Sequence, residues 1–209
     1  MKILRFEFKN EISYGVLNGS EISFIASPFD EPIIYLGKSA PLSEVRLLAP
    51  TVPSKIVAAG LNYRAHTAEL SEKEPSEPLF FLKPSTSVLA PFEDIPIYEN
   101  AGRTDYEAEL AAVIKKECRG VSPKEAKEYI LGYTVLNDVT ARDLQKKDGQ
   151  WTRAKGFDGY CPIGPVIETE LDTENLSIVC ELDGATVQNG TTADMIWNAE
   201  TLVSFASAL

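Results

Sequence analysis

Two glutamates, Glu107 and Glu109, lie two residues apart in a stretch of alternating character that runs from residue 104 to residue 114. If this stretch is one β-strand, both carboxylates point to the same face, because successive strand side chains alternate between the two faces. Residues two apart in a strand are separated by about 6.6 Å at the backbone, so both side chains can reach one cation. A hard divalent ion with oxygen ligands would compensate two carboxylates on a half-buried face, and a solvated acidic edge strand is the alternative.

Such a cation needs at least one more carboxylate, and Asp138 is our candidate. Asp138 lies near the end of the β-branched stretch from residue 133 to residue 143, which we expect to form a strand. An aspartate at a strand end is otherwise a turn or helix-cap residue. The pattern therefore predicts a three-carboxylate metal site built from two strands.

His66 is the single histidine of the chain, and Glu69 follows it by three residues. On a helical turn these two side chains share a face, which would let Glu69 orient His66 as a base. A surface pair is the ordinary alternative. Residues 71–78 are charged and contain two prolines, which is typical of a mobile flap that could close the pair over a ligand.

Lys155 lies in a segment that also carries Trp151, Gly156 and Phe157. A lysine on an ordinary loop is solvated, whereas one beside a metal-bound anion acts as a positive clamp or a proton donor. The chain contains neither of the common glycine-rich phosphate-binding motifs.

Several local signals predict the elements that must position these groups. Residues 1–50 resemble a small β-rich domain with a hairpin turn at Asn18-Gly19, and the prolines of residues 47–53 indicate a connector to a domain over residues 54–209. Ser122 begins a capping box that predicts a helix closed by Gly132. We also expect a rigid turn at residues 162–165, a second hairpin turn at residues 183–184, and a helix from Ala193 to the last residue.

Composition bounds the classes of partner. The 209 residues carry a formal net charge of -11 and are 44% hydrophobic, which fits a globular domain and argues against nucleic acid or an anionic membrane as a partner. No segment resembles a signal peptide or an apolar membrane span, and the three cysteines are odd in number. We therefore expect a cytoplasmic protein with reduced thiols.

Several motifs occur in the order of a known family. They are Gly60-Leu61-Asn62-Tyr63-x-x-His66-x-x-Glu69, the Phe81-x-Lys83-Pro84 run, Asp105-Tyr106-Glu107-x-Glu109-Leu110, Gly132-Tyr133-x-x-x-Asn137-Asp138-Val139-x-Ala141-Arg142-Asp143-x-Gln145, and Lys155-Gly156-Phe157-Asp158 with Pro162-x-Gly164-Pro165. Over residues 54–209 the chain resembles the fumarylacetoacetate hydrolase family. Its front unit resembles, more weakly, the N-terminal domain of the branch named 2-hydroxyhepta-2,4-diene-1,7-dioate isomerases.

The resemblance implies a mixed α+β, mainly β fold, a mixed β-roll that encloses Mg2+ or Mn2+, usually in a homodimer. By motif position, it implies the following roles: Glu107, Glu109 and Asp138 as metal ligands, His66 and Glu69 as a dyad on a lid, and Arg142, Gln145 and Lys155 as groups that face the substrate.

The implied substrate is a small anionic 2-oxo or 1,3-diketo acid, whose carboxylate and keto oxygens can chelate the cation. The cation then stabilises the enolate that develops when a neighbouring C–C or C–H bond breaks. We expect C–C cleavage by a hydrolase or decarboxylase, with isomerisation of the 2-hydroxyhepta-2,4-diene-1,7-dioate type as the alternative. The family usually continues with further C-terminal strands, whereas this chain ends at Leu209, so a catalytically impaired metal-binding relative is a further alternative.

Overall fold

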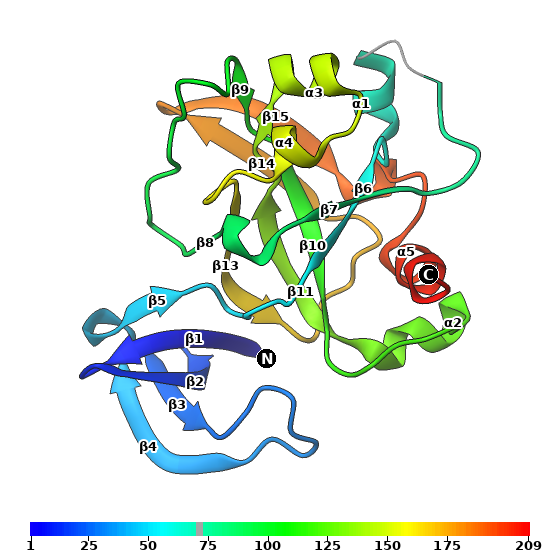
Figure 1. Ribbon diagram of the computed structural model, residues 1–209. Helices are drawn as coiled ribbons and strands as arrows, with labels where there is room; N and C mark the ends of the chain where they lie inside the picture. The colour runs from blue at the N-terminus through cyan, green and yellow to red at the C-terminus, as the bar shows by residue number, and fades with distance from the viewer. Residues whose placement is uncertain (70–72) are drawn as a thin grey trace.

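The computed structural model of the protein describes residues 1–69 and 73–209 and shows a mainly β fold, as predicted (Figure 1). Its strands are β1 (Lys2–Phe8), β2 (Glu11–Asn18), β3 (Glu21–Ile25), β4 (Tyr35–Pro41), β5 (Arg46–Leu48), β6 (Ile56–Gly60), β7 (Leu79–Lys83), β8 (Val88–Leu89), β9 (Thr104–Asp105), β10 (Ala108–Ile114), β11 (Ile130–Asn137), β12 (Thr140–Ala141), β13 (Cys161–Glu168), β14 (Ser177–Leu182) and β15 (Ala185–Thr191).

Short helices connect the strands. The α-helices are α1 (Arg64–Glu69), α2 (Pro123–Ala126), α3 (Arg142–Asp148), α4 (Thr152–Lys155) and α5 (Ala199–Ser207), and single 3-10 turns cover Leu42–Glu44, Ser85–Ser87, Lys127–Tyr129 and Thr192–Asp194. No helix among residues 1–69 and 73–209 is both long and apolar enough to span a bilayer.

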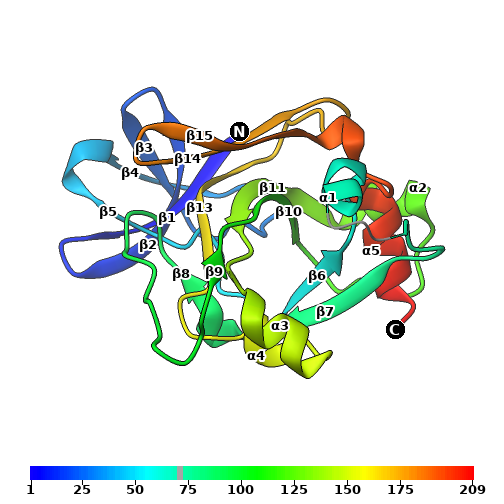
Figure 2. The same ribbon diagram turned by 90° about the horizontal axis from the view of Figure 1, so that it is seen from above.

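One large sheet runs through the molecule in the order β10-β11-β13-β1-β2-β3-β4, with β5 and β8 paired at its side. The N-terminal strand β1 joins β13 through the pairs Lys2↔Glu168 and Ile3↔Ile167. The strands of the first fifty residues therefore continue the sheet that carries β10 and β11. Figure 2 shows β1 and β13 side by side from above.

The N-terminal strands enclose an apolar core. Phe6 and Phe24 pack edge to face with ring centroids 4.9 Å apart, and Leu4, Ile22 and Ala40 complete the buried cluster. The predicted hairpin turn is confirmed, because Asn18 pairs with Glu21 and leaves a two-residue connection. Its first residue, Gly19, has φ +61°, a backbone conformation that residues other than glycine rarely adopt.

Two further local predictions are confirmed. The turn between β14 and β15 is Asp183-Gly184, and both residues have positive φ, as a tight hairpin turn requires. The side chain of Ser122 accepts a hydrogen bond from the Glu125 N–H, and the Glu125 carboxylate accepts one from the Ser122 N–H. This pair is the predicted capping box of α2.

The predicted end of that helix at Gly132 is wrong. The α-helix ends at Ala126, and Gly132 lies inside β11. A Cβ at this position would lie 2.5 Å from the carbonyl oxygen of Glu168 in β13. The glycine therefore permits close contact between neighbouring strands, which cannot be inferred from the local sequence.

Two other element predictions are also wrong. Residues 162–165 form part of β13 instead of a turn. The last helix begins at Ala199 instead of Ala193, because the Asn198 side chain accepts a hydrogen bond from the Thr201 N–H and so caps the helix there. Residue Met195, before the cap, forms a β-bridge with Tyr63 instead.

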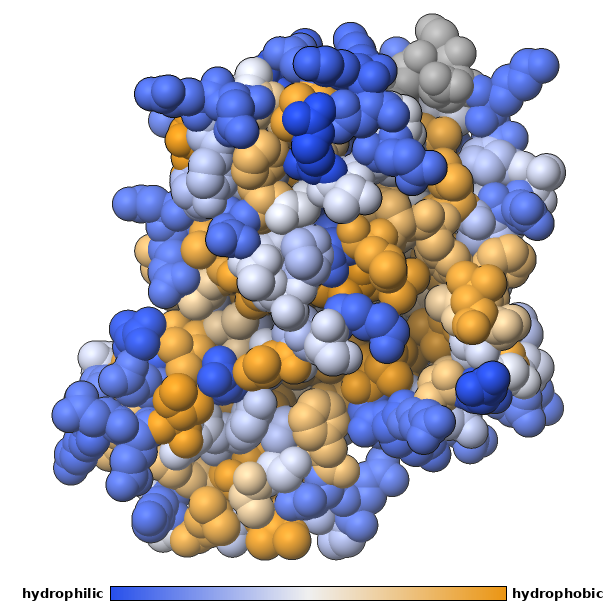
Figure 3. Space-filling model, viewed as in Figure 1, coloured by the Kyte–Doolittle hydropathy of each residue, from blue (hydrophilic) through white to orange (hydrophobic). Residues whose placement is uncertain are grey.

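The surface divides into regions of different character. Figure 3 shows apolar residues gathered over the middle of the viewed face, and hydrophilic residues along the upper rim. Val57 and Leu82 face each other across the β6–β7 pair and stay exposed. Cys118, Cys161 and Cys180 are free thiols, as expected.

Candidate metal centre

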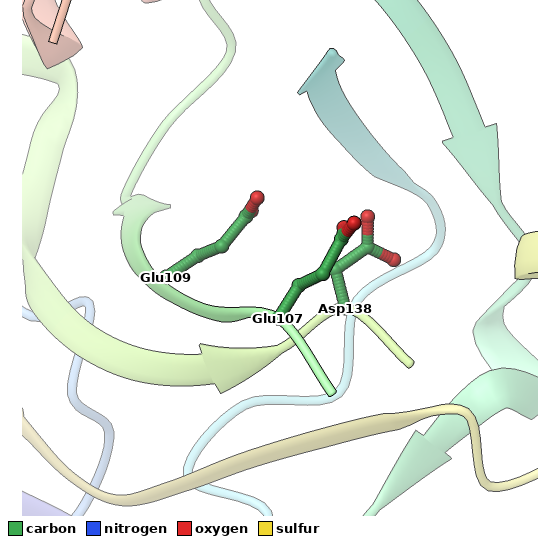
Figure 4. Close-up of side chains that lie close together, drawn as sticks. All are labelled: Glu107, Glu109 and Asp138. Atoms are coloured by element: carbon green, nitrogen blue, oxygen red, sulfur yellow. The ribbon is translucent and has the colours of Figure 1, made fainter. Parts of the chain in front are cut away.

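The three predicted carboxylates converge. One oxygen from each of Glu107, Glu109 and Asp138 lies within 4.8 Å of the others, and Figure 4 shows all three side chains pointing into the same space. Glu107 lies just before β10, Glu109 lies in β10, and Asp138 is the residue that follows β11. The predicted juxtaposition is confirmed, and the role of these residues as ligands stays a prediction.

The backbone route to this convergence differs from the predicted one. Residues 104–114 form two strands, β9 and β10, instead of one, and Glu107 lies in the break between them. The Glu107 N–H donates to the side-chain oxygen of Asn137 at 2.9 Å, and its carbonyl accepts from the Asp138 N–H at 2.8 Å. Glu107 is therefore held by the end of β11 instead of by strand alternation alone.

Asp138 is buried between two lysines. It is 1% exposed, and its two carboxylate oxygens accept hydrogen bonds from Lys83 Nζ at 2.6 Å and from Lys155 Nζ at 2.5 Å. Lys83 and Lys155 are themselves buried. These two ammonium groups compensate a carboxylate in a place where an unpaired charge would be costly.

Lys83 belongs to this centre, and its role was not predicted from the sequence. The sequence offered one signal, a lysine at the end of the apolar run Leu79–Lys83. A lysine that is buried in such a strand needs an acidic partner, and Lys83 is buried. Its partner Asp138 lies 55 residues away in the chain. Only the tertiary fold brings the two together.

Glu107 is compensated by two cations, one of which, Lys155, it shares with Asp138. Its oxygens accept hydrogen bonds from Arg142 Nη2 at 2.6 Å and from Lys155 Nζ at 2.7 Å. Desolvation alone would raise the pKa of the Glu107 carboxyl, but the charges of Lys155 and Arg142 outweigh it and lower that pKa. Glu107 therefore presents a carboxylate at neutral pH.

Glu109 is different. In the described part of the chain, no hydrogen bond or ion pair reaches its carboxylate. Desolvation, with the nearby charges of Asp138 and Glu107, raises the pKa of Glu109 well above its ordinary value. A carboxylate without a basic partner, close to two others, is the arrangement that a bound divalent cation would relieve, so the residues present fit such an ion.

Of the predicted substrate groups, Arg142 and Lys155 contact Glu107, and Gln145 contacts Arg142. Arg142 donates from Nε to Asp105 at 2.9 Å and from Nη1 to the side-chain oxygen of Gln145 at 2.9 Å. Desolvation lowers the pKa of Arg142, and Glu107 and Asp105 more than offset this, so the net shift is upward. Arg142, Gln145 and Lys155 thus lie together beside the carboxylates, although their contact with a substrate stays a prediction.

The predicted dyad is described only in part. Residues 64–69 form helix α1, so His66 and Glu69 have the expected helical spacing, but the side chain of His66 lies outside the described residues. The Ala65 N–H donates to Asp194 Oδ2 at 2.7 Å, and Asn62 bonds to the backbone of Trp197, which ties this segment to the chain before α5. The predicted flap includes residues 71 and 72, which also lie outside the description, and its mobility stays a prediction.

A cavity of about 540 Å³ lies beside the start of α1. It is lined by Ala65, Asn175, Ser177, Asn189, Gly190, Thr191 and Asp194. None of the three carboxylates lines it. Chemistry at the centre would therefore depend on the carboxylates and their basic neighbours, not on this cavity.

Comparison with known proteins gives two matching family models. The model described as Fumarylacetoacetate (FAA) hydrolase C-terminal matches residues 55–209, and the model described as Rv2993c-like, N-terminal matches residues 1–50.

Named relatives cover most of the chain. A solved structure of 2-hydroxyhepta-2,4-diene-1,7-dioate isomerase from Mycobacterium marinum is 39% identical, with a TM-score of 0.92 over 100% of this chain and 82% of that one. A 5-carboxymethyl-2-hydroxymuconate delta-isomerase from Mycobacterium smegmatis is 39% identical, with a TM-score of 0.90 over 100% and 83%. The mitochondrial oxaloacetate tautomerase fahd2 of Xenopus laevis is 42% identical over 79% of this chain and 54% of its own length.

Proposed function

Because this chain belongs to the fumarylacetoacetate hydrolase family, we propose that it is a divalent-metal-dependent enzyme that forms the enolate of a small anionic 2-oxo acid. One observation carries the proposal: the carboxylate oxygens of Glu107, Glu109 and Asp138 lie within 4.8 Å of one another. Among the described residues no lysine or arginine forms a hydrogen bond or ion pair with Glu109, and its pKa is raised, so a cation would complete the set. Mg2+ and Mn2+ both accept such oxygen ligands.

The chain's own residues supply the rest of the chemistry. A divalent ion held by the three carboxylates would act as a Lewis acid toward the charge that develops on an enolate oxygen. Lys155 lies 2.5 Å from Asp138 and 2.7 Å from Glu107, so its ammonium is beside the place where that charge would form. One donor of this kind contributes about 3 kcal/mol to transition-state stabilisation.

Local charge also allows an anionic substrate to bind. The whole chain has a formal net charge of -11, which repels a dicarboxylate at long range. Lys83, Lys155 and Arg142 gather at the centre and, with a divalent ion, would reverse the sign locally. Much of the attraction should therefore depend on the metal.

The names of the relatives favour proton transfer as the reaction. A tautomerase and two isomerases are among the proteins that resemble the chain. Both reaction types move a proton and a double bond, and an enolate allows this without a water nucleophile. We therefore place tautomerisation or isomerisation of a 2-oxo dicarboxylic acid first.

Hydrolytic or decarboxylating C–C cleavage is the second candidate, favoured by the family name and preferred from sequence alone. Hydrolysis needs a base for water, which His66 oriented by Glu69 would supply. Cleavage and the homodimer implied by the resemblance both stay predictions.

The test is a product assay on the Mn2+-loaded chain. Oxaloacetate, an acylpyruvate and 2-hydroxyhepta-2,4-diene-1,7-dioate are supplied separately, while ultraviolet absorbance follows enol interconversion and pyruvate formation reports cleavage. Asp138→Asn with the same Mn2+ corrects for reaction catalysed by free metal. Metal-dependent enol interconversion without pyruvate supports the first candidate, pyruvate formation supports the second, and full activity in EDTA would overturn the proposal.

A further inference from the structure

The strand β10, which begins just after Glu107 and carries Glu109, has an unpaired edge. In the described sheet, β10 is the terminal strand and pairs only with β11. An edge strand leaves every second residue with an N–H and a C=O that point away from its neighbour, and buried groups of this kind need partners. At Ala108, which is 8% exposed and lies between Glu107 and Glu109, these groups cannot rely on water.

A single side chain meets this need. Gln188 of β15 accepts a hydrogen bond from the Ala108 N–H at 2.8 Å and donates one to the Ala108 carbonyl at 2.8 Å. The carboxamide thus offers one acceptor and one donor, as the backbone of a neighbouring strand would. Gln188 is half-buried, whereas Val187 and Asn189 on either side of it are exposed.

The same short segment is held from the opposite side. The Glu107 N–H donates to the Asn137 side chain, and the Glu107 carbonyl accepts from the Asp138 N–H. Residue 107 is therefore fixed toward β11, and residue 108 is fixed toward β15. The backbone groups of residues 107 and 108 are thereby held from two opposite sides. This part of the backbone carries the Glu107 side chain and leads directly to Glu109.

We infer that Gln188 is a positioning residue of the metal centre, one that holds Glu107 and Glu109 in the convergent arrangement by taking the place of a strand partner at Ala108. The inference rests on the proposed function, since it assumes that the three carboxylates bind a cation. The Gln188 carboxamide bonds to the backbone of Ala108. It acts through the backbone, and loss of its two hydrogen bonds lets the start of β10 move relative to Asp138.

A purely structural role would be anchorage of the β14–β15 hairpin. The chain offers a matched control, because the hairpin has a second tie to the same segment: the Tyr106 hydroxyl donates to the Val187 carbonyl at 3.3 Å. Tyr106→Phe removes that tie and leaves the contacts of Ala108 intact. Anchorage alone predicts similar consequences for both substitutions.

The experiment measures Mn2+ affinity by electron paramagnetic resonance and thermal stability by calorimetry on the full chain. We expect Gln188→Met, which keeps the length of the side chain and removes both hydrogen bonds, to weaken Mn2+ binding about tenfold or more, in the range typical of outer-shell partners. Tyr106→Phe should change the affinity less than about twofold at a similar loss of stability. Gln188→Asn keeps the carboxamide but shortens its reach, and serves if the methionine variant does not fold.

The outcomes separate the two ideas. Wild-type affinity in Gln188→Met and Gln188→Asn, with Mn2+ bound normally by the unmodified chain, overturns the positioning role and leaves the proposed function standing. Failure of the unmodified chain to bind Mn2+ overturns both. Equal weakening by Tyr106→Phe and Gln188→Met also overturns the inference, since hairpin anchorage would then explain the effect.

Discussion

The core around Phe6 and the centre around Asp138 belong to the same large sheet region and are equally buried, yet they are stabilised in opposite ways. Phe6 and Asp138 are 0% and 1% exposed. The first packs against apolar side chains, so its burial is favourable by itself. The second is tolerable only because Lys83 and Lys155 donate to it.

The two regions therefore serve different purposes. An apolar core gains free energy from every contact and offers no group that binds a ligand. A buried charge cluster contributes little net stability, but it keeps ionised groups in a dry place where they interact strongly with an added ion. Glu109 forms no ion pair with a basic residue in the described part of the chain and marks where that ion would add most. Substitutions in the two regions should therefore separate folding from binding.

The largest effect is expected from Asp138→Asn. This change removes a proposed ligand and leaves Lys83 and Lys155 buried without their shared counter-charge, so the free energy of unfolding should fall by about 3 to 5 kcal/mol. Mn2+ affinity should fall by more than about 100-fold, beyond what outer-shell changes cause. Calorimetry and Mn2+ titration measure the two effects.

The matched control is Asp148→Asn. Asp148 forms two hydrogen bonds with Arg153 at the surface, and the same substitution there should destabilise the fold far less than Asp138→Asn and leave Mn2+ affinity unchanged. Similar stability losses at the two positions would contradict the distinction between buried and surface charge.

A comparable loss of stability, without loss of binding, is expected from Phe6→Ala. The cavity beside Phe24 should lower the free energy of unfolding by about 3 to 5 kcal/mol. At a temperature where the variant is folded, its Mn2+ affinity should equal that of the unmodified chain. Phe92→Ala, at a side chain that is 91% exposed, should change stability by less than about 0.5 kcal/mol. Impaired metal binding in folded Phe6→Ala would join the two regions that we separate.

Glu109→Gln should raise the stability of the metal-free protein, whereas the two preceding substitutions lower it. The neutral amide removes repulsion from Glu107 and Asp138, so the metal-free variant should melt at a higher temperature than the metal-free unmodified chain. Its Mn2+ affinity should fall by roughly tenfold or more. Glu99→Gln, at an exposed position, should leave both quantities unchanged. A lower melting temperature for metal-free Glu109→Gln would show that this carboxylate has a stabilising partner.

The smallest effect concerns the junction between the regions. Glu168 of β13 accepts a hydrogen bond from the Met1 ammonium at 3.0 Å. Desolvation raises the pKa of Glu168, but the ammonium outweighs it and the pKa is lowered. The ionised form therefore stabilises the fold above the carboxyl pKa of the unfolded chain, and this contribution, at most about 1 kcal/mol, is lost as pH falls through the lowered folded-state pKa.

This pH dependence is checked by denaturation at successive pH values. Glu168→Gln should flatten the acid limb of the stability curve slightly and leave metal binding near neutral pH unchanged. An acid limb identical in both proteins would show that the junction does not depend on this ion pair.

Much of the local structure was readable from sequence because short-range rules decide it. Gly19 and Asp183-Gly184 identify their hairpins through backbone conformations that few residues adopt. Ser122 and Glu125 cap a helix with groups only three residues apart. The spacing of Glu107 and Glu109, with Asp138 near the end of another strand, left a shared metal site as one alternative, and the order of the family motifs favoured it. The three carboxylates do meet in the structure.

The tertiary structure decided what surrounds them. Lys83 and Gln188 reach the centre from positions 55 and 80 residues away from their partners, and no local pattern distinguishes them from ordinary strand residues. Gly132 was predicted to end a helix, because a glycine after a helical segment is a common stop signal. Its actual role is to allow close contact with the strand β13. Sequence specifies which groups carry charge and which turns the backbone can make. The partners of a buried charge are selected by packing between distant segments, which exists only once the chain has folded.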